Sequence, residues 1–391
     1  MTTRAGSGTS HLTDAYQAGH TAARQAASAL AGHAPTLVIA FTTDQYDQAE
    51  VVRGIRAATD NAALIGCCTG GIISSDGPSS AGLVVLALWS DVMDVTLALE
   101  TGIQAAPTLI AETVADRLEP HIPAAGSQRR AVALMLADGL TGSLTEVVQH
   151  TTTTLGPLCP LVGGGAGDNL KFLRTSQFVN DQVSSDGIAL ALISTTAPVG
   201  IGVQHGWTPA GRALVVTRSD GNVIWELDGR PAFTVYRELF PDAELTAENF
   251  GAFVISHPIG LPQANGEFLI RDPLRTRADG AIECVASVPD HAVAHIMQGT
   301  PESLFAAAQA ATRSALAQLG AHKPAAVLVF DCVSRLIMLG DEAKTEVRLI
   351  QEIAGLETPI AGMFSFGEIA AAETGGALFH NKTVVVYAIG Q

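Results

Sequence analysis

The sequence has little positive charge and few charged residues altogether. Of its 391 residues, 22 are Lys or Arg and 38 are Asp or Glu, which gives a formal net charge of −16. No run rich in Lys or Arg is present to neutralise phosphates, so the sequence argues against nucleic acid as a partner. An anionic membrane surface is disfavoured for the same reason.

The sequence also lacks the features of a targeting segment and the cysteine spacing of a cross-linked protein. The N-terminal stretch Met1–Gly8 is polar and lacks the apolar core of a signal peptide. The strongest apolar run, Leu83–Trp89, is less than half as long as a spanning helix requires. We therefore expect a soluble cytoplasmic protein. The five cysteines (67, 68, 159, 284 and 332) are odd in number and form no Cys-x-x-Cys pair, so neither a disulfide framework nor a structural zinc site is indicated.

What the chain does contain is apolar surface to bury. Hydrophobic residues make up 47% of the sequence and charged residues 15%. This balance favours a large core over disorder. A chain of this length is roughly two to three times a typical domain, so two domains are expected.

Four glycine-marked segments recur at nearly constant spacing. Their first glycines, at positions 66, 163, 260 and 362, lie 97, 97 and 102 residues apart. Such spacing indicates one supersecondary unit used four times. The segments are Leu64–Gly71, Leu161–Asp168, Pro258–Phe268 and Pro359–Ile369.

Around each segment the pattern predicts a β-α-β-β unit. In the last copy an apolar strand at 327–330 precedes an amphipathic helix at 346–354, and a second strand follows at 384–387. Three copies are preceded by an alanine-rich helix (about 12–30, 108–118 and 301–319), and the third copy is the most divergent. The predicted fold class is α/β, with mixed sheets covered by helices in two halves.

The last third of the chain carries four motifs in a fixed order: Asp331–Arg335, Leu339-Gly340, Gly362–Ile369 and His380-Asn381-Lys382-Thr383. Their order resembles the C-terminal half of FIST (F-box and intracellular signal transduction) sensory proteins, and the glycine blocks upstream together with Val203–Pro209 look like the N-terminal half. On this resemblance the chain divides into a leading segment at 1–34, a FIST N-terminal domain at 35–218 and a FIST C-terminal domain at 219–391.

The resemblance implies intracellular sensing of a small molecule, such as an amino acid or a related metabolite, without enzyme activity. No output domain follows before Gln391, so we expect a stand-alone sensor that signals to a separate partner. Some FIST proteins similar to this one bind haem, sense nitric oxide and regulate a histidine kinase or a cyclic-di-GMP enzyme. That gas-sensing function is the alternative prediction.

The predicted ligand site centres on Arg335, Phe366 and Glu368, with Ser365, Cys332 and Asn381 beside them. Glu368 would take the ammonium of an amino acid and Arg335 would hold its carboxylate in a bidentate fork. The alternative is that Arg335 and Glu368 pair with each other or with backbone. Asn381 could equally serve a turn or a strand-end hydrogen bond.

Other readings of these residues stay open. The glycine segments could bring backbone N–H groups to a ligand, or could serve only tight packing. Asp168 stands where a phosphate loop would need lysine, so nucleotide binding is disfavoured. Cys332 could be a nucleophile with His380 or His205 as its base, which would make the protein a hydrolase, or an inert buried thiol.

Haem would require an axial ligand, usually histidine. His205 and His257 are the candidates, because each follows an apolar strand and has neighbours that could wall a pocket. Each could instead be a structural loop histidine. No Cys-x-x-Cys-His motif is present for covalent attachment.

Overall fold

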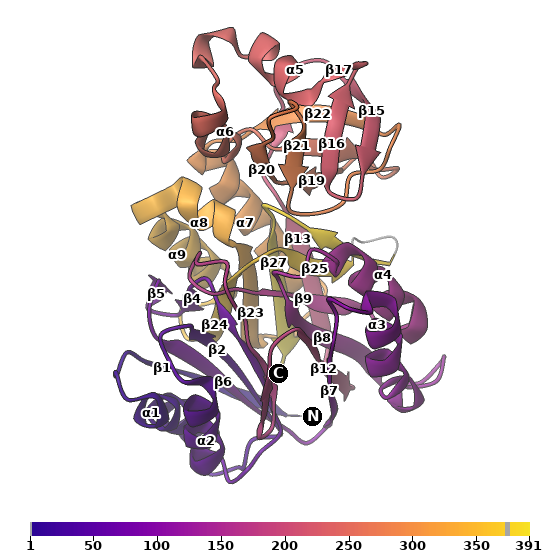
Figure 1. Ribbon diagram of the computed structural model, residues 1–391. Helices are drawn as coiled ribbons and strands as arrows, with labels where there is room; N and C mark the ends of the chain where they lie inside the picture. The colour runs from indigo at the N-terminus through magenta and orange to yellow at the C-terminus, as the bar shows by residue number, and fades with distance from the viewer. Residues whose placement is uncertain (1, 372–375) are drawn as a thin grey trace.

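The computed structural model describes residues 2–371 and 376–391, and in it the chain forms a large body and a smaller lobe (Figure 1). The lobe is built from residues 208–298, and the body from the chain before and after it. Both chain termini lie in the body (Figure 1). The lobe is therefore an insertion into the body.

Three six-stranded mixed sheets form the body, and each follows the same strand order. In every sheet an edge strand pairs with the last strand of its unit, and that strand pairs with a central strand. The central strand pairs in parallel with the glycine-marked strand, and a short hairpin pairs with the glycine-marked strand and forms the far edge. The first sheet runs β1 (Thr3–Ser10), β6 (Leu83–Ser90), β2 (Leu37–Thr43), β3 (Leu64–Thr69), β10 (Gln177–Val179) and β11 (Gln182–Ser184).

The other two sheets repeat this order with later segments of the chain. The second runs β7 (Met93–Thr101), β12 (Gly187–Thr195), β8 (Arg130–Asp138), β9 (Leu161–Ala166), β25 (Glu368–Ala371) and β26 (Ala377–His380). The third runs β13 (Val199–Gln204), β27 (Val384–Gly390), β23 (Pro324–Cys332), β24 (Ile360–Ser365), β4 (Ile72–Ser74) and β5 (Gly77–Ser79).

The closing hairpins are exchanged in a cycle between the three units. The hairpin of the first unit, β4–β5, pairs with β24 of the last. The hairpin of the last unit, β25–β26, pairs with β9 of the second, and β10–β11 of the second pairs with β3 of the first. Because every unit completes its neighbour's sheet, the body has pseudo-threefold symmetry and its three sheets depend on one another.

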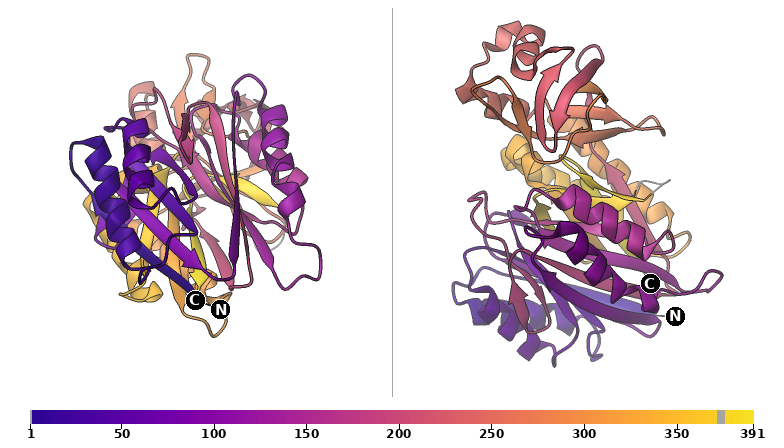
Figure 2. Two further views of the ribbon diagram at one scale, coloured as in Figure 1. Left: turned by 90° about the horizontal axis from the view of Figure 1, so that it is seen from below. Right: turned by 45° about the vertical axis from the view of Figure 1, so that its right-hand side comes forward.

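Helices cover the outer faces of the sheets, as the view from below shows (Figure 2). Polar residues start several of them: Asp47 accepts hydrogen bonds from the N–H groups of Ala49 and Glu50, and Thr300 forms a capping box with Ser303. The helices of the body are α1 (Ala15–Ser28), α2 (Gln48–Ala58), α3 (Pro107–Asp116), α4 (Leu144–Leu155), α7 (Pro301–Ala317), α8 (Val333–Leu339) and α9 (Ala343–Ala354), with the short turns η1 (Glu119–His121) and η3 (Gly340–Glu342).

The core of the body has an inner part and outer parts. Alternate residues of the central strands, among them Phe41, Leu134 and Phe330, meet in one cluster between the three sheets. Their neighbours along the strands face outward and pack under the helices in separate clusters. The central strands are thus buried on both faces, which explains their unbroken apolar sequences.

The lobe has an antiparallel sheet of nine strands with helices at one side. Its own apolar cluster includes Tyr236, Phe250 and Ile282. The strands are β14 (Thr208–Pro209), β15 (Leu214–Asp220), β16 (Val223–Leu227), β17 (Arg230–Pro231), β18 (Ile259–Pro262), β19 (Phe268–Arg271), β20 (Pro273–Thr276), β21 (Ile282–Cys284) and β22 (Val293–Gln298), and the helices are α5 (Ala232–Leu239), α6 (Ala247–Val254) and the turn η2 (Pro241–Ala243).

The predicted α/β class, with mixed sheets covered by helices, is confirmed. The first, second and fourth predicted copies are the three units of the body, each with an additional edge strand before its alanine-rich helix. The third copy is not a unit of this kind, because β16 pairs antiparallel with both β15 and β21 and has no parallel partner. Its segments belong to the lobe, which enters between β13 and α7, and the predicted boundary after residue 218 falls within β15.

Candidate functional site

The three glycine-marked strands of the body converge at one end of it through backbone hydrogen bonds. Gly70 N–H donates to Phe364 O at 3.0 Å, Phe366 N–H to Gly165 O at 2.9 Å, and Gly167 N–H to Cys68 O at 3.1 Å. A Cβ on Gly165 would lie 2.7 Å from Phe366 O. Close packing of three backbones therefore accounts for these glycines.

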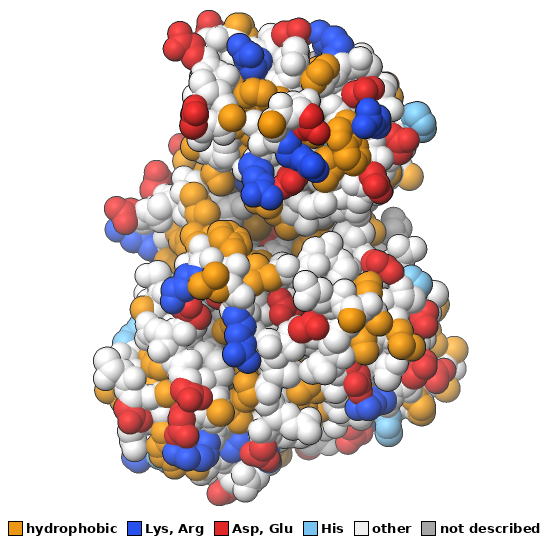
Figure 3. Space-filling model, viewed as in Figure 1, with side chains coloured by type: hydrophobic (Ala, Val, Ile, Leu, Met, Phe, Trp, Pro, Cys, Tyr) orange, Lys and Arg blue, Asp and Glu red, His pale blue; other side chains and the backbone are white. Residues whose placement is uncertain are grey.

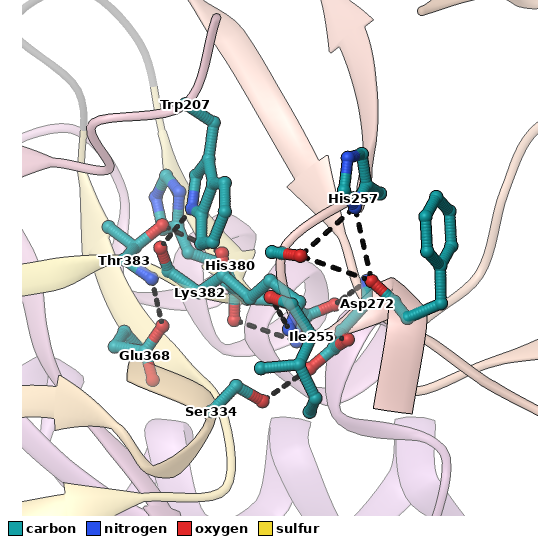
Figure 4. A network of polar contacts seen from close by, with 12 residues as sticks. Trp207, Ile255, His257, Asp272, Ser334, Glu368, His380, Lys382 and Thr383 are labelled. Carbon is teal, nitrogen blue, oxygen red and sulfur yellow. Dashed lines mark hydrogen bonds and ion pairs between the residues drawn. The ribbon is translucent and has the colours of Figure 1, made fainter. Parts of the chain in front are cut away.

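Next to this convergence, the His380–Thr383 segment joins the body to the lobe (Figure 4). Lys382 Nζ lies 3.0 Å from Asp272 Oδ1 and donates to Ile255 O at 3.1 Å, and both partners belong to the lobe. The indole N–H of Trp207 donates to Lys382 O at 2.8 Å. Ser334 on α8 donates to Asp272 Oδ2 at 2.5 Å. Asp272 is thus held by two groups of the body.

A cleft of about 450 Å³ opens between body and lobe beside these contacts. Figure 3 shows the hollow between the two parts, with hydrophobic side chains gathered along its edge. Its volume lies within the range of small-molecule sites. The lobe contributes Asn222, Gly251, Ile255, Asp272, Pro273, Leu274, Cys284 and Val285, and the body contributes Gly139, Leu140, Gly142, Leu170, Phe172, Cys332, Val333, Ser334, Ile337, Phe366, Gly367 and Asn381.

Large apolar side chains stand exposed at the mouth of the cleft. Leu274 of the lobe is 49% exposed, and Phe172 of the body is 59% exposed. The Phe172 ring stacks on Phe366, with 5.2 Å between the ring centroids. Exposed apolar surface at the rim of a concave site is typical of a binding site.

Behind the cleft wall, Glu368 is fully buried. Its carboxyl accepts a hydrogen bond from Thr383 N–H at 3.1 Å and lies 2.7 Å from Ser365 Oγ. Burial raises the pKa of Glu368 to about 8. Ser365 Oγ also lies 3.1 Å from Asp331 O. A serine has one hydroxyl proton, so both contacts of Ser365 are satisfied when Glu368 is protonated and donates to it.

Arg335 is also fully buried, in an ion-pair cluster of its own. Its Nε lies 2.7 Å from Asp331 Oδ1, and its Nη2 contacts Glu346 Oε1. The remaining donors bond His205 O at 2.8 Å and Leu304 O at 3.1 Å. Burial opposes the charge, but Glu346 and Asp331 raise the pKa of Arg335 above its ordinary value. The pKa of Asp331 is also raised well above its ordinary value, mainly by burial and next by the charge of Glu346.

The predicted ligand residues thus separate into three groups. Cys332, Phe366 and Asn381 line the cleft, and Ser365 and Glu368 lie directly behind it. Arg335 lies outside the lining of the cleft. Its Nη atoms bond Glu346 and two carbonyls, and its Nε lies against Asp331. This arrangement does not favour the predicted bidentate contact between Arg335 and the carboxylate of a ligand.

Sequence reasoning missed Asp272, Lys382 and Ser334. Lys382 and Ser334 stand at variable positions within recognised motifs, so their place in the sequence did point to this region. Asp272 has no such signal, because it meets its partner only through the fold, 110 residues along the chain.

Cys332 is a buried thiol at the cleft wall, and burial raises its pKa well above the ordinary value. That shift disfavours the thiolate a nucleophile requires. In the described part of the chain, no hydrogen bond joins Cys332 to His205 or His380, the bases expected for it.

His205 does not fit the axial haem ligand expected of it. Its Nδ1 accepts a hydrogen bond from Trp207 N–H at 2.9 Å, so the proton of the neutral ring is on Nε2 and no lone pair remains there for iron. Burial lowers the pKa of His205 to about 4, which keeps the ring neutral. The cleft it lines measures about 330 Å³ and carries the polar side chains of Gln263, Asn265 and Glu267.

At His257, Nδ1 lies 3.0 Å from Ser256 Oγ and 3.2 Å from Phe253 O. Its ring stacks on Phe253 at 4.1 Å and meets Phe240 edge-on at 4.8 Å. These rings form the aromatic cluster of the lobe and not the walls of a slot for a porphyrin. The residues at both histidines therefore fit haem poorly.

Within residues 2–371 and 376–391, no group of three or more His, Cys, Asp or Glu side chains is arranged to hold a metal ion. Over the same residues, no helix has the length and apolar character to cross a membrane.

Comparison with known families and proteins covers nearly the whole chain. A model of the FIST N domain matches residues 36–230, and a model of the FIST C domain matches residues 232–371. Similar chains include an uncharacterized protein of Mycobacterium bovis, 29% identical over 94% of both chains. Another, from Mycobacterium tuberculosis, is 27% identical over 96% of this chain and 97% of its own.

Likeness to solved structures is weak. A chorismatase matches 93% of this chain and 95% of its own at 9% identity, with a TM-score of 0.35. A cyanuric acid hydrolase from A. caulinodans matches 49% of this chain and 71% of its own at 13% identity, with a TM-score of 0.29.

Proposed function

Because the chain belongs to the FIST family, whose domains are sensory, we propose that it senses a small metabolite in the cleft between body and lobe. The observation that carries this proposal is the convergence of Cys332, Phe366 and Asn381, from three separate family motifs, on one cleft of ligand size. Two of these motifs also make the contacts to the lobe, through Ser334 and Lys382.

The cleft walls suggest a ligand with an apolar part. Leu140, Ile255, Val285 and Val333 offer aliphatic surface, and the stacked Phe366 and Phe172 offer an aromatic face. Amino acids and related metabolites with apolar side chains remain the expected class.

Sensing would proceed by movement of the lobe. The chain enters the lobe after β13 and leaves it before α7, so two connecting segments of backbone join the lobe to the body. Gly206 and Gly299 lie in these connections. A ligand that contacts both walls stabilises the arrangement in which they are close, in proportion to its affinity difference between the two states. A partner protein, such as a histidine kinase or a cyclic-di-GMP enzyme, would read that arrangement.

A thermal-shift screen of a metabolite library tests the cleft as the ligand site. A ligand at about 100 times its dissociation constant adds roughly 2.7 kcal/mol of stability, which raises the melting temperature by several degrees. The variant that blocks the cleft is Leu274→Trp with Ile337→Trp, which places an indole on each wall. The matched control is Leu356→Trp, at a leucine that is 74% exposed on the body.

We expect hits that stabilise the wild type and the control but not the blocked variant, with a smaller radius of gyration in solution scattering when the ligand is bound. Equal stabilisation of the blocked variant would contradict the cleft as the site.

A further inference from the structure

The charged residue in the lining of the cleft is already paired with a group of the body. Among the described residues that line it, none is Lys, Arg or His, and Asp272 is the acidic one. Asp272 faces Lys382 Nζ at 3.0 Å and accepts from Ser334 at 2.5 Å. A ligand would therefore meet a carboxylate whose charge is compensated.

The ionisable groups behind the wall have partners of their own. Arg335 is enclosed by Asp331 and Glu346. The contacts of Ser365 with Asp331 O and with Glu368 are both satisfied by a protonated, uncharged Glu368. The thiols of Cys332 and Cys284 are buried. Among the described residues that line the cleft, a charged ligand would meet only one ionic group, Asp272, and that carboxylate is already paired.

Either sign of ligand charge would be disfavoured. A carboxylate would lie beside Asp272 with no cation on the wall to pair with it. An ammonium at Asp272 would lie close to Lys382, which is itself fully buried and cannot turn to water. An unpaired charge in a desolvated site costs more than a neutral polar group that finds hydrogen bonds.

The neutral polar groups of the cleft come from both walls. Asn222 of the lobe uses one amide proton on Cys284 O, and Asn381 of the body uses one on His380 O. Each side chain retains a second amide proton. The Oδ1 of Asn381 already accepts from Asp272 N–H at 3.4 Å and keeps a second lone pair, and the Oδ1 of Asn222 can accept as well. Two carboxamides on facing parts can together hold an amide or a hydroxyl group.

We infer that the cleft selects an uncharged ligand, an apolar or aromatic compound bearing an amide or hydroxyl group, and discriminates against zwitterionic amino acids. This inference rests on the proposed function, since it concerns the same cleft. It narrows the ligand class from amino acids in general to their uncharged relatives.

The test uses probes that share a phenyl ring and differ in charge. Affinities of 2-phenylacetamide, phenylacetate, 2-phenylethylamine and L-phenylalanine are measured by calorimetry at pH 7 with the full chain. We expect the amide to bind roughly tenfold or more tightly than each charged probe. Phenylacetate, 2-phenylethylamine or L-phenylalanine binding as tightly as the amide would overturn the inference, as would an amide that fails to bind at millimolar concentration.

The Lys382→Met variant provides a second readout, because it leaves Asp272 without its cation. We expect 2-phenylethylamine to gain at least about tenfold in affinity for this variant, while phenylacetate gains nothing. If the variant does not fold, the probe series on the wild type still decides.

The blocked variant Leu274→Trp with Ile337→Trp separates this inference from the proposed function. A probe that still binds the blocked variant would bind outside the cleft, and this result would contradict both the proposed function and the inference. A charged probe that binds the wild type tightly and is lost in the blocked variant would leave the sensing cleft standing and refute only the selection for uncharged ligands.

Discussion

Glu368 provides a direct test of the electrostatics beneath the cleft, through the pH dependence of stability. The pKa of this fully buried carboxyl is raised from 4.5 to about 8 by burial. The folded state therefore binds a proton that the unfolded chain has released at neutral pH. Stability from this proton is complete below about pH 4.5 and is lost as pH rises through 8.

The size of the effect follows from the shift. Between pH 6.5 and pH 8, the folded protein holds most of a proton at Glu368 and the unfolded chain holds almost none. At about 1.4 kcal/mol for each proton and pH unit, the wild type should lose roughly 1–2 kcal/mol over this interval through Glu368. Asp331 has a raised pKa as well, and the charge of Glu368 contributes to it. The difference between wild type and variant therefore reports Glu368 together with its effect on Asp331.

Glu368→Gln is the matched perturbation, because a glutamine has the hydrogen-bonding pattern of a protonated glutamate. Its amide N–H can donate to Ser365 Oγ, and its carbonyl can accept from Thr383 N–H. Urea unfolding at half-unit steps from pH 6.5 to 8 measures both proteins, with Glu357→Gln, at an exposed position, as the control. We expect the variant to have a flatter profile by roughly 1–2 kcal/mol and the control to follow the wild type.

Parallel profiles for wild type and Glu368→Gln would refute the reasoning. They would mean that Glu368 is ionised in the folded protein at pH 7, so that a negative charge stands behind the cleft. The inference of an uncharged ligand would then lose one of its supports.

Two further predictions concern buried groups that sequence reasoning placed in the site. Arg335→Met should destabilise the protein by about 3–5 kcal/mol in urea unfolding, because it leaves Asp331 and Glu346 buried without their cation. The control Arg348→Met, at an exposed pair with Glu352, should change the stability by less than about 0.5 kcal/mol. Equal effects of the two variants would mean that the buried cluster is not a structural unit. Titration with haemin should give the same absorption spectrum for wild type and His205→Ala, because the lone pair of the His205 ring is on Nδ1, which accepts from Trp207 N–H. A Soret band that is lost in the variant would contradict this tautomer.

The parts of the fold that could be predicted are those whose sequence reflects local packing. The strands β2 and β23 are buried on both faces, so their apolar runs identified them. The edge strand β1 was missed because it is made of small and polar residues. Its glycines are required by a contact distant in sequence: a Cβ on Gly6 would lie 2.2 Å from Ala26 O in α1.

The third predicted copy failed for a different reason. An Asp-Gly turn and a glycine-marked strand identify an antiparallel hairpin wherever one occurs, and the lobe contains such hairpins, as at Asp279-Gly280 between β20 and β21. Spacing alone could not separate a repeated unit from an inserted lobe of similar length. The exchange of hairpins between units was equally out of reach, because it pairs segments from opposite ends of the chain, as in β4 with β24.

The candidate site was predictable where a motif and the fold agree. Cys332, Phe366 and Asn381 were identified and do line one cleft. Arg335 was assigned to a ligand because, together with Glu368, it offers the pair of opposite charges that a zwitterion requires. Its i−4 neighbour Asp331 could have indicated a structural ion pair, but Glu346 joins that pair only through the packing of α9 on α8.

The position of the lobe explains why a cleft forms at this end of a pseudo-symmetric body. The central strands β2, β8 and β23 end at equivalent places, at Thr43, Asp138 and Cys332. Beyond β2, the surface is crossed by an ion pair between Asp44 and Lys171 at 2.6 Å. The lobe enters the chain in the third unit and covers the ends of β8 and β23, where Gly139 and Cys332 become one wall and the lobe the other. The body wall includes Phe366, whose backbone takes part in the convergence of the three strands. The lobe wall, with Asn222, Leu274 and Val285, is therefore the part that can vary in ligand preference without disturbing that convergence.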